Sequence, residues 1–133
     1  MHKKFGLSRA EKLKSVVRTD KLFTRGKTFW TFPFNVYYRI GGVDDVQANQ
    51  ILVSVGKHYF KHAVDRNRMK RLVREAYRLN KLPLLEAAQK AGLFFNVGLV
   101  YKCHSLSDFD TVQNSIIQII DHLKAIIERK KSK

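Results

Sequence analysis

Alternating apolar and polar side chains predict strands in the first half of this 133-residue chain. From residue 32 the alternation has a period of two, which is typical of a half-buried strand. Gly41-Gly42 and Asp44-Asp45 form a turn, and QILVSV at 50–55 reads as a second strand, which we expect to pair antiparallel with the first. A bend at Pro33 would give three strands in place of two. The apolar face of the first strand, assigned to the core, carries Phe32, Phe34, Val36, Tyr38 and Ile40.

Helical spacing predicts a short helix near the N-terminus. Ser8-x-x-Glu11 has the form of a capping box, and Ser15 is an equally good start. We prefer Ser15, with the helix running from about residue 16 to residue 25 and Gly26 as a left-handed cap. Val16, Leu22 and Phe23 are its apolar residues.

The second half of the chain combines one strand with helices. LFFNVGLVY at 93–101 is apolar throughout, as in a buried central or parallel strand. LPLLEAAQKA before it reads as a short helix that starts at Pro83 and is closed by Gly92. Ser107 or Asp108 would cap a last helix with apolar residues at helical spacing. The order of elements predicts one α+β domain over 1–133, a small sheet covered by helices, with a flexible basic arm at 1–12 and a flexible basic tail at 129–133.

Residues 65–78, DRNRMKRLVREAYR, form an amphipathic helix with an unusual polar face. At 100° per residue, the apolar side chains make one stripe that belongs in the core. The opposite side carries mostly arginine, and after Asp65 at the start of the helix, Glu75 is the only acid to offset repulsion between cations three and four residues apart. We call this surface the arginine ridge. It consists of Asn67, Arg71, Arg74 and Arg78 with Arg68 and Lys70 beside them.

The net charge of the chain favours a binding surface over a solvated face as the interpretation of the ridge. Lys and Arg number 26 against 11 Asp and Glu, a formal charge of +15, so a polyanionic partner is expected. Arginine forks suit phosphate oxygens. DNA recognition would call for a helix-turn-helix partner and more base-reading side chains, so RNA is preferred. A membrane surface is disfavoured because the cations are spread over the whole chain.

The compartment follows from two further features. The first residues, MHKKFGLSRAEKLK, lack the apolar core of a secretory signal, and no apolar run approaches the roughly twenty residues of a membrane span. A single cysteine, Cys103, fits a reducing compartment. We therefore expect a cytoplasmic protein.

RNRMKRLVREAYR at 66–78 closely resembles the arginine-rich signature of the protein subunit of bacterial ribonuclease P. Segments 13–29, 32–38 and 51–68 are similar to the family's first helix and turn, first strand and approach to the signature. The resemblance implies an α+β fold of the ribosomal-protein-S5-domain-2-like kind, with a mixed four-stranded sheet, three main helices and a left-handed βαβ crossover. It also implies an endoribonuclease holoenzyme in which one protein binds one catalytic RNA and removes the 5′ leader of precursor tRNA, with the chemistry and Mg²⁺ carried by the RNA.

The resemblance also implies which residues bind. Contacts to the catalytic RNA map to Arg66, Asn67, Arg68, Lys70, Arg71 and Arg74, and our helical count adds Arg78. The leader would lie as a single strand in a cleft between the first helix and the sheet, where Phe23 and Tyr37 match the family's aromatic residues, with Lys57 and Lys61 nearby. Thr19 departs from the pattern because many relatives carry phenylalanine there, so one stacking contact is missing or has moved to another residue.

Other reactive side chains carry weaker signals. Trp30 beside the strand start could be buried or could stack. His58 and His62 with Cys103-His104 are a poor zinc set, because a closed site needs four ligands held together. No catalytic triad, carboxylate pair or phosphate loop stands out, so we expect no cofactor bound by the protein alone. The function hypothesis is a ribonuclease P protein subunit. The alternative is a structural RNA-binding protein of ribosomal type, and a stand-alone nuclease ranks third.

Overall fold

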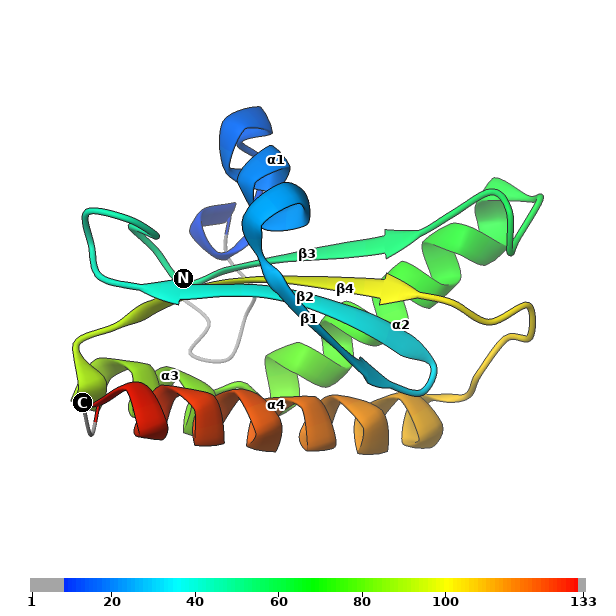
Figure 1. Cartoon of the computed structure of the whole chain (residues 1–133). Helices are drawn as coiled ribbons and strands as arrows, with labels where there is room; N and C mark the ends of the chain where they lie inside the picture. Colours follow the sequence, from blue (N-terminus) through cyan, green and yellow to red (C-terminus); the bar gives the residue numbers. More distant parts are fainter. Residues whose placement is uncertain (1–8, 132–133) are drawn as a thin grey trace.

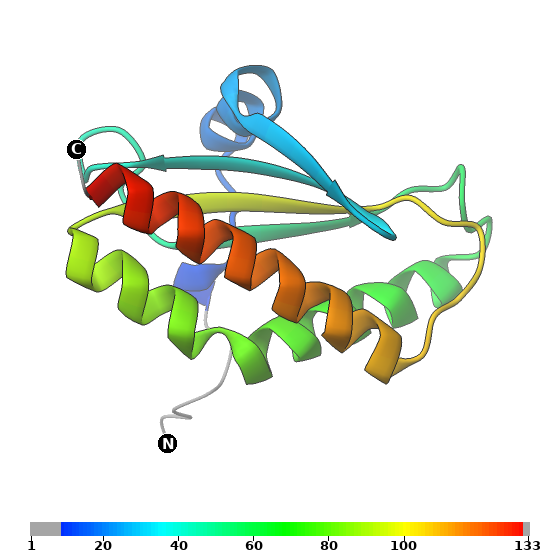
Figure 2. The same ribbon diagram turned by 60° about the horizontal axis from the view of Figure 1, so that its bottom comes forward.

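The computed structural model describes residues 9–131, and within them a four-stranded sheet separates one helix from three others (Figure 1). Helix α1 lies alone on one face, and α2, α3 and α4 cover the other face (Figures 1 and 2). The predicted α+β class is confirmed. The elements in chain order are η1 Arg9–Glu11, α1 Val16–Arg25, β1 Lys27–Thr31, β2 Phe34–Gly41, β3 Gln50–Val55, α2 Ala63–Asn80, α3 Leu82–Ala91, β4 Phe94–Tyr101 and α4 Phe109–Lys131.

The strand order in the sheet is β1-β2-β4-β3. β2 pairs antiparallel with both β1 and β4, whereas β4 is the one named strand that pairs with β3, and the two run parallel. The prediction that 50–55 pairs antiparallel with the preceding strand is therefore wrong. β4 takes the position between them because it is apolar along its length, and only a central strand is covered on both faces. The connection from β3 through α2 and α3 to β4 is left-handed, as the resemblance implies (Figures 1 and 2).

The bend at Pro33 separates β1 from β2, so the sequence's alternative of three strands before α2 is the one observed. Thr31 and Phe34 are paired across β1 and β2, so Phe32 and Pro33 form the connection, with a cis peptide bond between them. Phe34 is buried as predicted, but Phe32 is 60% exposed, so its assignment to the core is wrong. Period two holds only within a strand, and Phe32 lies in the turn.

Helix α1 begins as predicted from Ser15, whose Oγ accepts a hydrogen bond from the Arg18 N–H at 3.3 Å. Ser8, the alternative start, lies outside the described residues. Gly26 ends the helix in an extended conformation, φ −71° and ψ 157°, so the predicted left-handed cap is wrong. Glycine is needed here for space, because a Cβ atom would lie 2.3 Å from the Leu22 carbonyl oxygen.

The starts and ends of the later helices agree closely with the sequence. Gly92 closes α3 with φ 67°, the left-handed conformation that favours glycine. The predicted start at Pro83 falls one residue inside α3, which begins at Leu82. Of the two candidate caps for α4, Asp108 is used: its carboxylate accepts a hydrogen bond from the Thr111 N–H at 2.9 Å.

Residues near both ends are anchored to the domain. Of the arm predicted to be flexible at 1–12, residues 9–12 are described, and the Gln50 side-chain amide at the sheet edge donates to the Ala10 carbonyl at 3.0 Å. Lys81 is buried between α2 and α3, and its Nζ donates to the Glu11 carboxylate at 2.8 and 3.0 Å. Of the predicted flexible tail, residues 129–131 continue α4. No helix within the described residues is long and apolar enough to cross a membrane.

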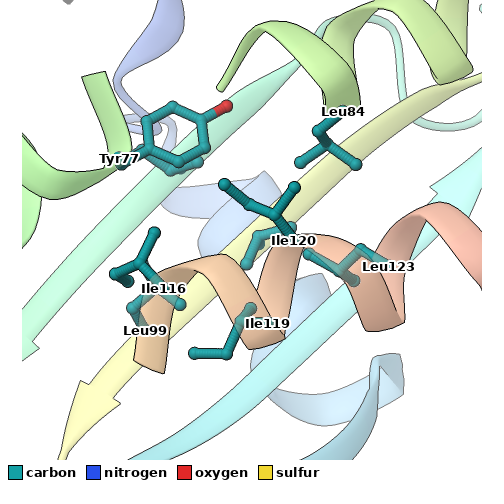
Figure 3. Close-up of a pocket in the computed structure, with 9 residues that line it drawn as sticks. Tyr77, Leu84, Leu99, Ile116, Ile119, Ile120 and Leu123 are labelled. Carbon is teal, nitrogen blue, oxygen red and sulfur yellow. The ribbon is translucent and has the colours of Figure 1, made fainter. Parts of the chain in front are cut away.

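The core fills the space between the sheet and helices α2, α3 and α4. Side chains from these layers surround a residual void of about 10 Å³, too small for a ligand (Figure 3). Because this side of the sheet is closely packed, a partner would have to bind at the outer surfaces of the protein. The residues labelled in Figure 3 are Tyr77, Leu84, Leu99, Ile116, Ile119, Ile120 and Leu123.

Candidate nucleic-acid interface

Helix α2 has one face in the core and the arginine ridge on the other. Met69, Val73, Ala76 and Tyr77 are buried, which confirms the predicted apolar stripe. Burial also raises the pKa of the Tyr77 hydroxyl. The helix is longer than predicted, 63–80 in place of 65–78, and its packing holds the backbone beneath the ridge in place. Asn67, Arg68, Arg71 and Arg74 are exposed, while Lys70 and Arg78 are half-buried.

Three guanidinium groups of the ridge have no acidic partner in the part of the chain that the structure describes. Among the described residues, no hydrogen bond or ion pair joins Arg68, Arg71 or Arg74 to a carboxylate. Arg78 differs, because its Nε donates to a Glu75 carboxylate oxygen at 3.0 Å. That hydrogen bond lowers the pKa of Glu75 and raises the pKa of Arg78. The unneutralised charge of the ridge therefore extends from Arg68 to Arg74, about two helical turns.

Arg66 at the start of α2 has a structural contact of its own. Its Nη1 donates to the carbonyl oxygens of Phe60 at 2.9 Å and Lys61 at 3.0 Å. The guanidinium group thus ties the loop between β3 and α2 to the first turn of the helix. Arg66 positions this loop beside the ridge.

The sheet face that carries α1, which we call the open face, brings Phe23 and Tyr37 together. Their ring centroids are 4.8 Å apart with the planes at 67°, an edge-to-face contact. Phe23 is 37% exposed and Tyr37 is half-buried. Because the rings touch, a base cannot enter between them and would stack on their outer surfaces.

Gly98 in β4 allows this close approach of α1 to the sheet. A Cβ atom at Gly98 would lie 3.1 Å from Leu22 Cδ2 and 3.5 Å from Phe23 Cζ. The residue is paired with Tyr37 across β2 and β4, so it lies beneath the aromatic pair. Gly98 was not among the residues predicted from the sequence, although a lone glycine inside an apolar strand is the usual signal of a close approach.

The other predicted leader residues do not gather around the aromatic pair. Thr19 is half-buried one turn before Phe23, so that turn of α1 carries no ring. Lys57 and Lys61 are exposed in the loop after β3. Because the Lys61 carbonyl accepts from Arg66, that loop is linked to the start of the ridge.

The histidines lie in a different arrangement from the pair considered in the sequence. The rings of His58 and His104 are 5.3 Å apart, and Tyr59 lies 4.7 Å from His104. His62 precedes the first turn of α2, and Cys103 is half-buried. Within residues 9–131, no three His, Cys, Asp or Glu side chains come together as a metal site.

Known proteins similar to this chain identify its family and its fold. The family model Ribonuclease P matches residues 7–124. The chain is 42% identical over 119 residues to the ribonuclease P protein component of Porphyromonas gingivalis, covering 86% of this chain and 87% of that protein. It is 29% identical over 114 residues to the corresponding component of Chlorobium phaeobacteroides, covering 77% of each.

Two solved structures share the fold at low sequence identity. The RNase P protein of Staphylococcus aureus superimposes with a TM-score of 0.66 at 19% identity, covering 86% of this chain and 95% of that chain. The RNase P protein from Thermotoga maritima gives a TM-score of 0.64 at 23% identity, covering 84% and 96%.

The fold and the ridge, with these matches, define a small basic α+β protein of the ribonuclease P type. The chain belongs to the ribonuclease P protein family. The resemblance seen in the sequence is thereby confirmed, and membership implies partnership with the ribonuclease P RNA.

Proposed function

We propose that this protein is the ribonuclease P subunit that binds the catalytic RNA and the 5′ leader of precursor tRNA. The arginine ridge contacts the catalytic RNA, and the open face near Phe23 and Tyr37 holds the leader. The RNA performs the endonucleolytic cleavage, with Mg²⁺ held by RNA phosphates. One protein acts with one RNA in the cytoplasm.

The observation that carries the proposal is that, within residues 9–131, no carboxylate pairs with the guanidinium groups of Arg68, Arg71 and Arg74. Neighbouring cations on one helix face repel each other, so the unbound helix is slightly destabilised by them. A phosphate backbone removes this repulsion, and its binding releases condensed counterions. Guanidinium forks also bind phosphate oxygens in a bidentate manner. The buried stripe keeps the backbone beneath these groups rigid, which lowers the entropy lost on binding.

A separate observation supports the leader-binding role. Phe23 and Tyr37 present ring surface at the edge of α1, and unpaired bases stack on such rings whatever their sequence. The Asn35 side-chain amide donates to the Tyr37 hydroxyl at 3.4 Å, which helps to orient that ring. A single strand bound here places the rest of the precursor within reach of the catalytic RNA.

The first experiment tests the division of labour between protein and RNA. Purified protein with Mg²⁺ and precursor tRNA should give no cleavage, and the matching catalytic RNA should restore removal of the leader at low Mg²⁺. Cleavage by the protein alone would contradict the proposal. Failure of the protein to stimulate its RNA would favour the structural, ribosomal type of RNA-binding protein.

The second experiment tests the leader surface. Phe23→Ala and Tyr37→Ala should each weaken binding of leader-bearing precursor by about 1–3 kcal/mol, the value of a base stacked on a ring. Binding of mature tRNA, which has no leader, is the control and should change little. If both variants bind the precursor and mature tRNA with wild-type affinity, the leader-binding role is contradicted. The proposed role of the ridge is not affected by that result.

A further inference from the structure

Two aromatic side chains at the β1–β2 turn are exposed next to each other. Trp30 is 54% exposed and Phe32 is 60% exposed, and their ring centroids are 6.3 Å apart with the planes at 68°. Aromatic side chains carry the largest apolar surfaces in a protein, and they are usually buried or held for a partner. Neither residue is used by the function proposed above.

The strand register places Trp30 on the open face. Trp30 is paired with Asn35 and Thr28 is paired with Tyr37, so Trp30 and Tyr37 are diagonal neighbours on adjacent strands. Such neighbours are about 7–8 Å apart and within reach of large side chains. Phe23, Tyr37 and Trp30 therefore follow one another across the open face, and Phe32 lies just beyond the end of β1.

The turn that carries the two rings is held from two sides. The Ser115 hydroxyl of α4 donates to the Phe32 carbonyl at 2.8 Å, and the Lys102 N–H donates to the Pro33 carbonyl at 2.8 Å. A backbone held in this way loses little entropy when the rings bind a partner. The second bond also brings the exposed residue Lys102 next to the turn, where its charge suits a phosphate.

We propose that Trp30, backed by Phe32, is a second stacking site for an unpaired base of the precursor leader. The inference rests on the proposed function, and it deepens that function by extending the leader path beyond Phe23 and Tyr37. The net charge of +15 favours a polyanion over a second copy of this chain, which would carry the same charge. Trp30 also supplies a ring on the open face where Thr19 in α1 supplies none.

The chain's single tryptophan makes this site directly observable. Titration of the full-length protein with an unpaired oligoribonucleotide of leader sequence should change the Trp30 emission saturably. The same sequence in a duplex should change it far less, because paired bases do not offer a free face. Emission that stays constant while fluorescence anisotropy of a labelled oligonucleotide reports binding would overturn the site.

Leader length distinguishes this site from the Phe23–Tyr37 site. The holoenzyme assembled with its catalytic RNA should be compared on a precursor with a long leader and on one trimmed to reach only Phe23 and Tyr37. Trp30→Ala should weaken binding of the long-leader precursor about tenfold and leave the trimmed one unchanged. Trp30→Phe should restore most of the affinity, and Trp30→Leu, which keeps apolar bulk without a ring, should not.

Controls separate the possible failures. Val43 is 59% exposed in a different loop, so Val43→Ala should change neither precursor. If Trp30→Ala lowers the affinity for both precursors equally, or for neither, the Trp30 site is overturned. So would self-association of the protein that Trp30→Ala abolishes. If the wild-type protein does not stimulate its RNA, the proposed function fails, and the emission titration still decides whether Trp30 binds unpaired RNA.

Discussion

The two faces of the sheet are built from the same strands and serve different purposes. In β2, burial alternates: Phe34 and Val36 are buried beneath the helices, and Asn35 and Tyr37 between them remain half-exposed. Three helices cover the first face, whereas within the described residues only α1 lies on the open face (Figures 1 and 2). The covered face provides the stability, and the open face keeps side chains available for a partner.

The same division runs through α2. Its buried stripe contributes to the core, and its ridge carries charge without contributing to the stability of the fold. Since binding residues and core residues occupy opposite faces of the same elements, substitutions on one face should leave the property of the other face unchanged. The comparison can therefore be tested by pairs of substitutions.

The largest expected effect comes from a pair within β2. Phe34→Ala should lower the free energy of unfolding by about 3–5 kcal/mol, because it removes a fully buried ring and leaves a cavity beside Tyr101. Tyr37→Ala should lower it by about 1 kcal/mol, the value of its edge contact with Phe23. Urea denaturation followed by circular dichroism measures both. Equal losses would show that the open face is part of the core.

Substitutions in the ridge should have a smaller effect than Phe34→Ala, and they should affect RNA binding without affecting stability. Replacing Arg71 and Arg74 by Ala should weaken binding to the catalytic RNA and reduce the slope of log affinity against log salt by roughly one for each lost phosphate contact. The free energy of unfolding should stay within about 0.5 kcal/mol, because both side chains are exposed. Filter binding over a salt series measures the slope.

Matched variants separate charge from hydrogen-bond geometry at the ridge. Arg71→Lys with Arg74→Lys keeps the charge, so the salt slope should persist while the affinity falls with the loss of the forked donors. Lys90→Ala removes an exposed cation from α3 and should change neither quantity. A wild-type affinity that does not depend on salt would contradict the role of the ridge.

The sequence predicted features that depend on local spacing. The helical period identified α2 and both of its faces, because 3.6-residue periodicity needs no knowledge of the rest of the fold. Gly92 was predicted to close the helix that starts near Pro83, because the residue that ends a helix is set by local sequence. The resemblance to ribonuclease P proteins also rests on such a local stretch, the signature at 66–78.

Features that depend on distant contacts could not be predicted in this way. The pairing of β3 with β4 joins segments separated by two helices, and nothing within 50–55 specifies that partner. Gly26 was assigned a left-handed conformation, whereas the true constraint is the nearby Leu22 carbonyl. Whether Trp30 is buried or exposed could not be predicted, because the face of a strand residue depends on where the strand ends. The structure fixes that boundary at the turn that contains Pro33.

The smallest expected effect concerns the start of α4, the helix that covers the buried face. Hydrogen bonds from the Thr111 side chain and N–H lower the pKa of Asp108 below its usual value of 3.8. A carboxyl group whose pKa is depressed in the folded state stabilises that state above its unfolded pKa, and the contribution is lost as pH falls through the folded pKa. Acid should therefore loosen the first turn of α4 below about pH 4.

Asp108→Asn tests this contribution because asparagine caps helices as well as aspartate but does not titrate. Thermal unfolding should be similar for the variant and the wild type near neutral pH, and the variant should lose less stability as the pH falls below 3.8. Asp110→Asn makes the same change of charge two residues away and serves as the control. The open face lies across the sheet from α4, so binding of leader RNA at neutral pH should be the same in all three proteins. An Asp108→Asn variant with the wild-type acid profile would show that the cap contributes no pH-dependent stability, and altered leader binding would show that the two faces are coupled.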